Sequence, residues 1–278
     1  MIEIKRFVFT FLFCLTTTSM TSCIGKASKS KSSVLDYTRS AELQYLEALD
    51  EYEDRDCVSA EPHFQDVRRN FPYSRYAVLS ELRLADCQFV QGNHAEAAVL
   101  YEQFVKAHPT HEDAHYAAYR RGLCYYEMIP TDWLIMPPPY ERDQASTRDA
   151  RMAFTQFLAT YKDSPWRKEA EELLSVVVDA LVRHEIYVAE FYLSRSDRRA
   201  AAVRLENVRE NFKESPLVPD AMFLQAITYL EMNKTKDAIR VFNEIVNFYP
   251  KHYQSLRAKA YLKHLAAQGR GGERGGDG

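Results

Sequence analysis

The sequence predicts an all-α protein, a right-handed superhelical solenoid of five helix-turn-helix repeats. Three observations lead to this fold class. Turn-forming segments recur along the chain, small residues return at fixed intervals between them, and a large apolar residue follows every second small residue by one helical turn. With 46% hydrophobic and 27% charged residues, the composition is that of a folded globular protein.

Turn-forming segments mark the ends of the repeats. Each closes a stretch with helical periodicity and is followed by a new helix. They begin at Phe71, His108, Tyr161, Phe212 and Tyr249. The stretch from Trp166 to Arg195 contains no glycine or proline, so it is predicted to form one very long helix that leads into the fourth repeat.

Small residues occupy one equivalent position in each helix of every repeat. This register resembles the tetratricopeptide (TPR) repeat, in which small residues let two helices approach closely and large apolar residues fill the gaps. A generic helical core would not repeat one register five times. The small positions are Ala48, Ala85, Gly122, Ala189 and Ala226 in the first helices and Ala60, Ala97, Ala150, Ala201 and Ala238 in the second, with Phe64, Tyr101, Phe154, Leu205 and Phe242 four residues later.

An insertion interrupts the third repeat. The two small positions lie 12 residues apart in the other repeats but 28 apart in repeat three, so residues 129–144, IPTDWLIMPPPYERDQ, are assigned to the turn between its helices. Proline removes a backbone donor and restricts the preceding residue, so this segment continues neither helix. Trp133, Leu134, Ile135 and Met136 are therefore expected on a protruding loop. We hypothesise that this loop contacts another subunit or folds back over the concave face of the solenoid, where a binding groove is expected.

The N-terminus is predicted to be a processing signal. A short basic segment precedes a nine-residue apolar run, which is too short to span a bilayer, and small residues lie directly before Cys23. Cys23 is the predicted lipid-attachment site, although Met20 departs from the usual leucine; the alternative is an ordinary secretory signal. The expected division is a signal peptide (1–22), a lipidated cysteine with a flexible tether (23–40), the solenoid (41–267) and a disordered tail (268–278).

Composition and motifs exclude several function classes. A net charge of −3 provides no basic surface of the kind that binds nucleic acid. The sequence has no G-x-S-x-G, Walker or C-x-x-C motif. We therefore expect no enzyme activity, no cofactor and no nucleic-acid partner.

Histidines and cysteines are the remaining candidates for metal binding or cross-linking. His111 and His115 could share one helix face near His108, but His108 belongs to a turn segment and His111 to a helix start, so no metal site is expected. Cys87 and Cys124 occupy equivalent positions of neighbouring repeats, where helix axes about 8–10 Å apart exceed the Cα separation of a disulfide. They are expected to be buried thiols.

Aromatic residues recur on the face of the first helices that the TPR register makes concave. In repeats one to three they form pairs seven residues apart, with Leu82 in place of an aromatic residue in repeat two, and this spacing places each pair on one helical stripe. Amphipathic aromatic side chains with few rotamers suit a peptide-binding groove. The alternative is that some of them pack between repeats. The predicted peptide-binding residues are Tyr45, Tyr52, Leu82, Phe89, Tyr116, Tyr119 and Tyr126.

Local motifs add a family resemblance to the repeat pattern. Tyr45-x-x-Ala48 opens the first repeat, YRRGL begins at Tyr119, ERD and ARMAFTQFLATYKDSP follow the proline-rich run, and EIYVAEFYLSR precedes Arg204. With the cysteine-terminated signal and the interrupted third repeat, these motifs resemble the BamD family of outer-membrane lipoproteins of the β-barrel assembly (Bam) machinery. Lys162 and Lys213 replace prolines that are usual in the family.

The resemblance implies a non-enzymatic scaffold that is lipid-anchored in the outer membrane and faces the periplasm. Such proteins bind the POTRA domains of the barrel protein BamA, mainly through their C-terminal repeats. They also bind the aromatic-ended C-terminal signal of unfolded outer-membrane β-barrel proteins, mainly through their N-terminal repeats, and so promote folding and insertion. Other Bam lipoproteins are further candidate partners.

Arg204 is the residue for which the resemblance implies a specific contact. It matches a family arginine at the BamA interface, so a carboxylate of BamA is its expected partner. The alternative for Arg204 is a solvated helix residue. The alternative for the whole chain is a pilotin-type TPR lipoprotein that assists secretin assembly.

Overall fold

The computed structural model describes residues 29–131 and 135–273, and the chain divides into two parts, residues 1–40 and 41–278. Residues 29–40, predicted to belong to a flexible tether, are helical and begin helix α1 (Lys29–Glu53). The difference has a local cause, because no glycine or proline interrupts the chain between residues 26 and 61. Cys23, Trp133 and Leu134 lie outside the described residues.

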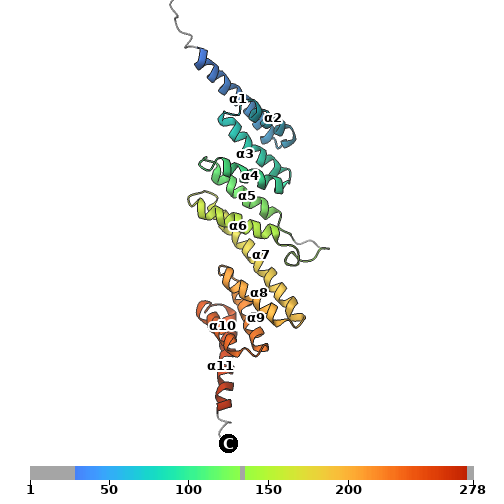
Figure 1. Ribbon diagram of the computed structural model, residues 1–278, viewed down its shortest axis with the longest axis vertical. Coiled ribbons are helices and arrows are strands. Elements are labelled where there is room, and N and C mark those ends of the chain that lie inside the picture. The colour runs from blue at the N-terminus through green and yellow to red at the C-terminus, as the bar shows by residue number, and fades with distance from the viewer. Residues whose placement is uncertain (1–28, 132–134, 274–278) are drawn as a thin grey trace, which may run out of the picture. The chain divides into compact units, whose positions relative to one another are not determined.

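Five helix pairs make up the second part, and the fold is the predicted all-α, TPR-like solenoid. From α2 to α11 each helix packs against the next one in the chain (Figure 1). The pairs are α1 with α2 (Cys57–Asn70), α3 (Arg75–Val90) with α4 (His94–Ala107), α5 (Ala114–Glu127) with α6 (Ala145–Thr160), α7 (Arg167–Ser194) with α8 (Arg198–Asn211), and α9 (Val218–Glu231) with α10 (Thr235–Phe248), followed by α11 (Tyr253–Glu273).

The predicted small positions are where helices meet. All ten of these residues are buried, and the nine alanines among them have no exposed surface. The five large apolar residues that follow one turn later, from Phe64 to Phe242, are likewise 0% exposed. A methyl group or a hydrogen at the small position lets the neighbouring helix approach closely. The large side chain one turn later is enclosed in the space beside that contact.

Four of the five turns within helix pairs share one backbone structure. A single residue with positive φ ends the first helix, and it lies five residues before the small position of the second helix. In repeat four the next amide, of Asp197, donates to the carbonyl of Tyr192 at 2.9 Å, which closes the first helix as a Schellman motif. The four residues are Arg55 (φ 63°), Gly92 (80°), Ser196 (62°) and Asn233 (58°).

Repeat three replaces this turn with a longer segment between α5 and α6, of which the structure describes residues 128–131 and 135–144. It contains one turn of 3₁₀ helix, η1 (Pro139–Glu141), which contacts α7. Ile135 and Met136 are 85% and 52% exposed. Gln144 stabilises the return into α6, because its side-chain amide donates to the carbonyls of Pro139 and Arg142 at 2.8 and 2.9 Å.

Two further features concern the long helices. The 28-residue α7 is the long helix predicted between Trp166 and Arg195, and it belongs to the core of both repeat three and repeat four. Helix α11 continues to Glu273, into the segment predicted to be a disordered tail. Helix elongation from an already formed and packed segment is favourable, so the glycines after residue 268 do not stop it at once.

The cysteines Cys57, Cys87 and Cys124 are free and buried, as predicted for Cys87 and Cys124. Burial raises the pKa of the Cys124 thiol to about 12. A thiol that stays protonated at neutral pH is a poor nucleophile, so these residues serve packing.

Gly122→Ala tests the close helix contact in repeat three. A Cβ at this position would lie 2.6 Å from the Phe154 Cε1 atom, and Phe154 is fully enclosed. Overpacking costs about 1–3 kcal/mol, more than the gain of about 1 kcal/mol in helix propensity, so we expect a lower urea midpoint. The double variant Gly122→Ala, Phe154→Leu should recover part of the loss. An unchanged or higher midpoint for Gly122→Ala would contradict this packing.

Candidate functional site

A fully buried carboxylate lies where the first three repeats meet. Asp86 of α3 is 0% exposed, and its Oδ1 accepts hydrogen bonds from the hydroxyls of Tyr101 at 2.5 Å and Tyr116 at 2.9 Å. Arg83, one turn earlier on α3, donates to the other carboxylate oxygen. A buried charge is stable only when it is paired and hydrogen-bonded, and Asp86 meets both conditions.

Arg120 of α5 completes this cluster from the neighbouring repeat. Its Nε donates to the Tyr101 hydroxyl at 3.1 Å and lies 4.0 Å from Asp86 Oδ1. The guanidinium carbon lies 3.8 Å from the centre of the Phe89 ring, a close cation–π contact. We call Arg83, Asp86, Tyr101, Tyr116 and Arg120 the Asp86 cluster.

The protonation states in the Asp86 cluster follow from burial. Burial, and then the charge of Asp86, raises the pKa of Tyr101 and of Tyr116 well above the usual 10. Both phenols therefore remain hydrogen-bond donors at neutral pH. Two arginines face one carboxylate, so this cluster carries one positive charge in excess.

The predicted peptide-binding residues divide into two groups. Tyr52, Phe89, Tyr116 and Tyr126 are half-buried and retain surface that a ligand can touch. Tyr52 also contacts the cluster, because the Arg83 guanidinium carbon lies 5.7 Å from the centre of its ring. These four residues remain candidates for binding.

The other three predicted residues belong to the interior. Tyr45 is 6% exposed and packs against the rings of Phe64 and Tyr76, with centroids 5.7 and 5.5 Å away. Tyr119 is 3% exposed and stacks on Trp166 at 5.1 Å, and Leu82 is 1% exposed. The transferred register correctly places them on the first helices, but the neighbouring helix covers their surface. These three side chains therefore have too little exposed surface to contact a ligand.

Arg83, Asp86 and Arg120 were missed as a site in the sequence. Asp86 directly follows the small residue Ala85 and precedes Cys87, so a charged residue occupies a register position surrounded by core residues. That placement was the available signal, because a buried carboxylate requires cationic partners. Arg83 lies three residues earlier on the same helix and could have been read from spacing, whereas the contribution of Arg120 depends on how α5 lies against α3.

The three histidines considered for metal binding have separate partners. His108 Nε2 lies 2.9 Å from Glu81, His111 Nδ1 accepts from the Asp113 amide at 3.1 Å, and His115 Nδ1 lies 3.1 Å from the Ser164 hydroxyl. Within the described ranges, no group of three His, Cys, Asp or Glu side chains has an arrangement that could hold a metal ion.

Arg204 lies on α8 and pairs with Glu185 of α7. Its Nη1 is 3.5 Å from the Glu185 carboxylate, and 44% of the Arg204 side chain is exposed against 15% for Glu185. The pair is therefore asymmetric. Glu185 is largely enclosed, whereas the guanidinium of Arg204 keeps surface for a second carboxylate.

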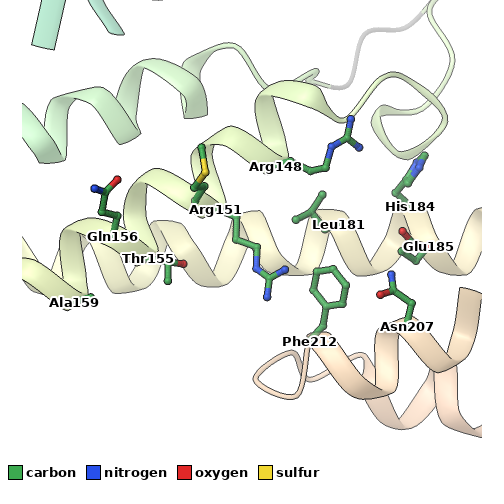
Figure 2. A pocket seen from close by; sticks show the side chains of 11 residues that line it. Arg148, Arg151, Thr155, Gln156, Ala159, Leu181, His184, Glu185, Asn207 and Phe212 are labelled. Carbon is green, nitrogen blue, oxygen red and sulfur yellow. The ribbon is translucent and has the colours of Figure 1, made fainter. Parts of the chain in front are cut away.

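A cavity of ≈710 Å³ adjoins this ion pair, because Glu185 is one of its lining residues (Figure 2). Met152, Leu181 and Phe212 form its apolar surface. Arg148 and Arg151 of α6 line it as well, and the Arg151 guanidinium carbon lies 4.5 Å from the centre of the Phe212 ring. We call this cavity the α6–α8 pocket. Its apolar floor and cationic lining suit a partner segment with an apolar side chain next to carboxylates.

Tyr140 of the repeat-three insertion contacts α7 at the edge of the α6–α8 pocket. His184, which lines the pocket, has its Nδ1 2.7 Å from the carbonyl oxygen of Tyr140, so this nitrogen donates. The rings of Tyr140 and Tyr187 lie 5.4 Å apart, centre to centre. Tyr140 and the Arg204–Glu185 ion pair thus both adjoin the pocket, Tyr140 through His184 and Arg204 through Glu185.

Comparisons with known proteins identify similar chains. A family model described as YfiO, outer membrane lipoprotein, matches residues 38–243. A curated relative from Caulobacter vibrioides (strain ATCC 19089 / CIP 103742 / CB 15), named outer membrane protein assembly factor BamD, is 27% identical over 81% of this chain and 71% of its own length. A relative of the same name from Neisseria gonorrhoeae is 24% identical over 84% of this chain and 88% of its own.

A solved structure also aligns with most of this chain, at low similarity. The TPR2AB-domain:pHSP90-complex of yeast Sti1 aligns with 83% of this chain and 85% of that chain at 13% identity, with a TM-score of 0.38, a level that supports no functional inference. In the part of the chain that the structure describes, no helix is both long and apolar enough to cross a bilayer.

Asp86→Asn tests the buried cluster. Removing the carboxylate charge leaves Arg83 and Arg120 without their counter-ion, and we expect a loss of about 3 kcal/mol in the free energy of unfolding. Tyr116→Phe, which removes one donor to a charged group, should cost about 1–2 kcal/mol. Asp163→Asn, at an exposed turn, is the matched control. Urea unfolding followed by circular dichroism measures all three, and equal midpoints for Asp86→Asn and Asp163→Asn would contradict the account.

Proposed function

The chain belongs to the YfiO family of outer membrane lipoproteins, and from that membership we propose a lipid-anchored scaffold with two binding surfaces. Its functional class is that of an outer membrane protein assembly factor, as its curated relatives are named. One surface, on repeats three and four, binds the POTRA domains of a BamA-like barrel protein. The other, on repeats one to three, binds the aromatic-ended C-terminal signal of unfolded β-barrel proteins. The observation that carries the proposal is the family match across residues 38–243.

The exposed half of the Arg204–Glu185 pair supports the partner surface. An incoming carboxylate gains a charge-assisted hydrogen bond from Arg204 without displacing the enclosed Glu185. The adjoining α6–α8 pocket offers an apolar floor for a neighbouring side chain of the same partner. The exposed Ile135 and Met136 of the insertion extend this surface, and we include them in the proposed interface.

Half-buried aromatic residues support the substrate surface. Tyr52, Phe89, Tyr116 and Tyr126 come from three successive first helices and retain exposed ring surface. Aromatic contacts of this kind provide large contact area at low conformational-entropy cost. An extended peptide with alternating aromatic residues is the ligand that such a row of rings fits.

Membrane attachment is proposed through Cys23. The sequence around this residue has the small residues that precede a lipidated cysteine, and a covalent lipid adds about 0.8 kcal/mol of membrane affinity per buried CH₂. Attachment of this kind requires no spanning helix. The protein would then act at the membrane surface on chains that are still unfolded.

Arg204→Ala tests the partner surface. We expect the tagged full-length protein, extracted gently from its native membranes, to recover about tenfold less POTRA-containing barrel protein, a loss of about 1.4 kcal/mol. Met136→Asp should weaken recovery in the same assay. Arg199→Ala, on the same helix and exposed, is the control and should recover the wild-type amount. Quantitative mass spectrometry gives the yields. Undiminished recovery with Arg204→Ala would remove Arg204 from the interface.

Cys23→Ser tests the anchor. We expect the wild-type protein to sediment with membranes and to show the added mass of acyl chains on residue 23, because the lipid holds it there. The serine variant should be soluble after export. Intact mass spectrometry and membrane fractionation measure the two properties, and an unmodified Cys23 in a membrane-bound wild type would rule out this attachment.

A further inference from the structure

We propose that Arg120 binds the free α-carboxylate at the end of the substrate peptide, beside aromatic walls formed by Phe89 and Tyr116. This inference rests on the proposed substrate surface and deepens it. It states which chemical group of the ligand is recognised, a chain terminus, and which side chain recognises it. Four features of the Asp86 cluster lead to it.

The first feature is the charge balance. Asp86 is the carboxylate shared by Arg83 and Arg120, and the contacts with them are unequal. Arg83 makes a direct charge-assisted hydrogen bond, whereas Arg120 lies 4.0 Å away and approaches with Nε only. The hydrogen bonds to the Asp86 carboxylate therefore come from Arg83 and the two tyrosine hydroxyls. The uncompensated positive charge resides on Arg120.

The second feature is the set of donors that Arg120 has left. Within the described residues, its one hydrogen bond runs from Nε to the Tyr101 hydroxyl. The two terminal nitrogens are adjacent and lie in the guanidinium plane, which is the geometry that binds a carboxylate with two parallel hydrogen bonds. The Arg120 side chain is 17% exposed, so it is largely enclosed but is not sealed from solvent.

The third feature is that the guanidinium is held in place before any ligand arrives. It lies 3.8 Å from the centre of the Phe89 ring and less than 6 Å from the centres of the Tyr101 and Tyr116 rings. The Nε bond to Tyr101 fixes rotation about the end of the side chain. A side chain that is already ordered loses little conformational entropy on binding. More of the attraction between Arg120 and the carboxylate therefore remains as binding free energy.

The fourth feature is the kind of surface around the charge. Phe89, Tyr116 and Tyr52 are half-buried, and the Tyr116 ring lies 6.0 Å from that of Trp166. An aromatic side chain that neighbours the terminal carboxylate can pack against these rings while the carboxylate pairs with Arg120. The combination selects for an aromatic last residue with an unblocked terminus. An internal aromatic segment has no such carboxylate and would bind more weakly.

The test compares two synthetic ten-residue peptides that end in phenylalanine and differ only at the terminus, one a free acid and the other an amide. Binding to the purified full-length protein in detergent is measured by fluorescence anisotropy. We expect the wild type to bind the acid at least about tenfold more tightly than the amide, as for a charge-assisted pair. For Arg120→Gln the two peptides should bind equally, at the affinity of the amide. Arg199→Gln, an exposed position outside the cluster, should keep the wild-type preference.

Each outcome has a distinct meaning. If the wild type binds both peptides equally well, carboxylate recognition is overturned and the substrate surface stands. If it binds neither peptide, the substrate surface itself fails. If the preference for the acid persists in Arg120→Gln, another residue reads the terminus and the assignment is overturned. Should Arg120→Gln not fold, Arg120→Lys replaces it: this variant keeps the charge beside Asp86 but not the paired donors, so a reduced preference supports the assignment and an unchanged one overturns it.

Discussion

The close approach of neighbouring helices at one small residue per helix is the constraint on which the other features depend. Nine alanines and Gly122 hold that position, and each leaves space for a large side chain such as Phe154 or Tyr101 to fill. Because the helices approach at these points, their remaining residues are brought into register across repeats. Asp86 can meet a tyrosine of α4 and an arginine of α5 only in that register.

The two candidate surfaces differ in the physics that stabilises them. The Asp86 cluster is a buried polar network, in which hydrogen bonds and ring contacts from α3, α4 and α5 position the charges. The α6–α8 pocket is an open apolar depression with arginines in its lining, and its ion pair is partly solvated. Rigid recognition of a small chemical group suits the first, whereas a protein surface that buries area suits the second.

Much of the fold was predictable because periodicity and residue size are local properties. The small positions, the long α7 and the buried thiols all follow from spacing, and the structure confirms them. The site was less predictable. Spacing places Tyr45 and Tyr119 on the right helices but does not determine what covers them, and Phe64, Tyr76 and Trp166 do. The positive-φ residues in the turns could not be predicted from the sequence either, because only Gly92 among the four is a glycine.

Helix α7 has a mechanical consequence. At 28 residues it is about 42 Å long, its first half is packed into the core of repeat three and its second half into that of repeat four. The turn at residues 161–166 separates α6 from α7, as turns do at the other repeat boundaries, but α7 itself runs without a break through the cores of both repeats. Movement of repeat four relative to repeat three would therefore have to bend α7 or pull it out of one of the two cores, and the continuous backbone hydrogen bonds of the helix oppose this.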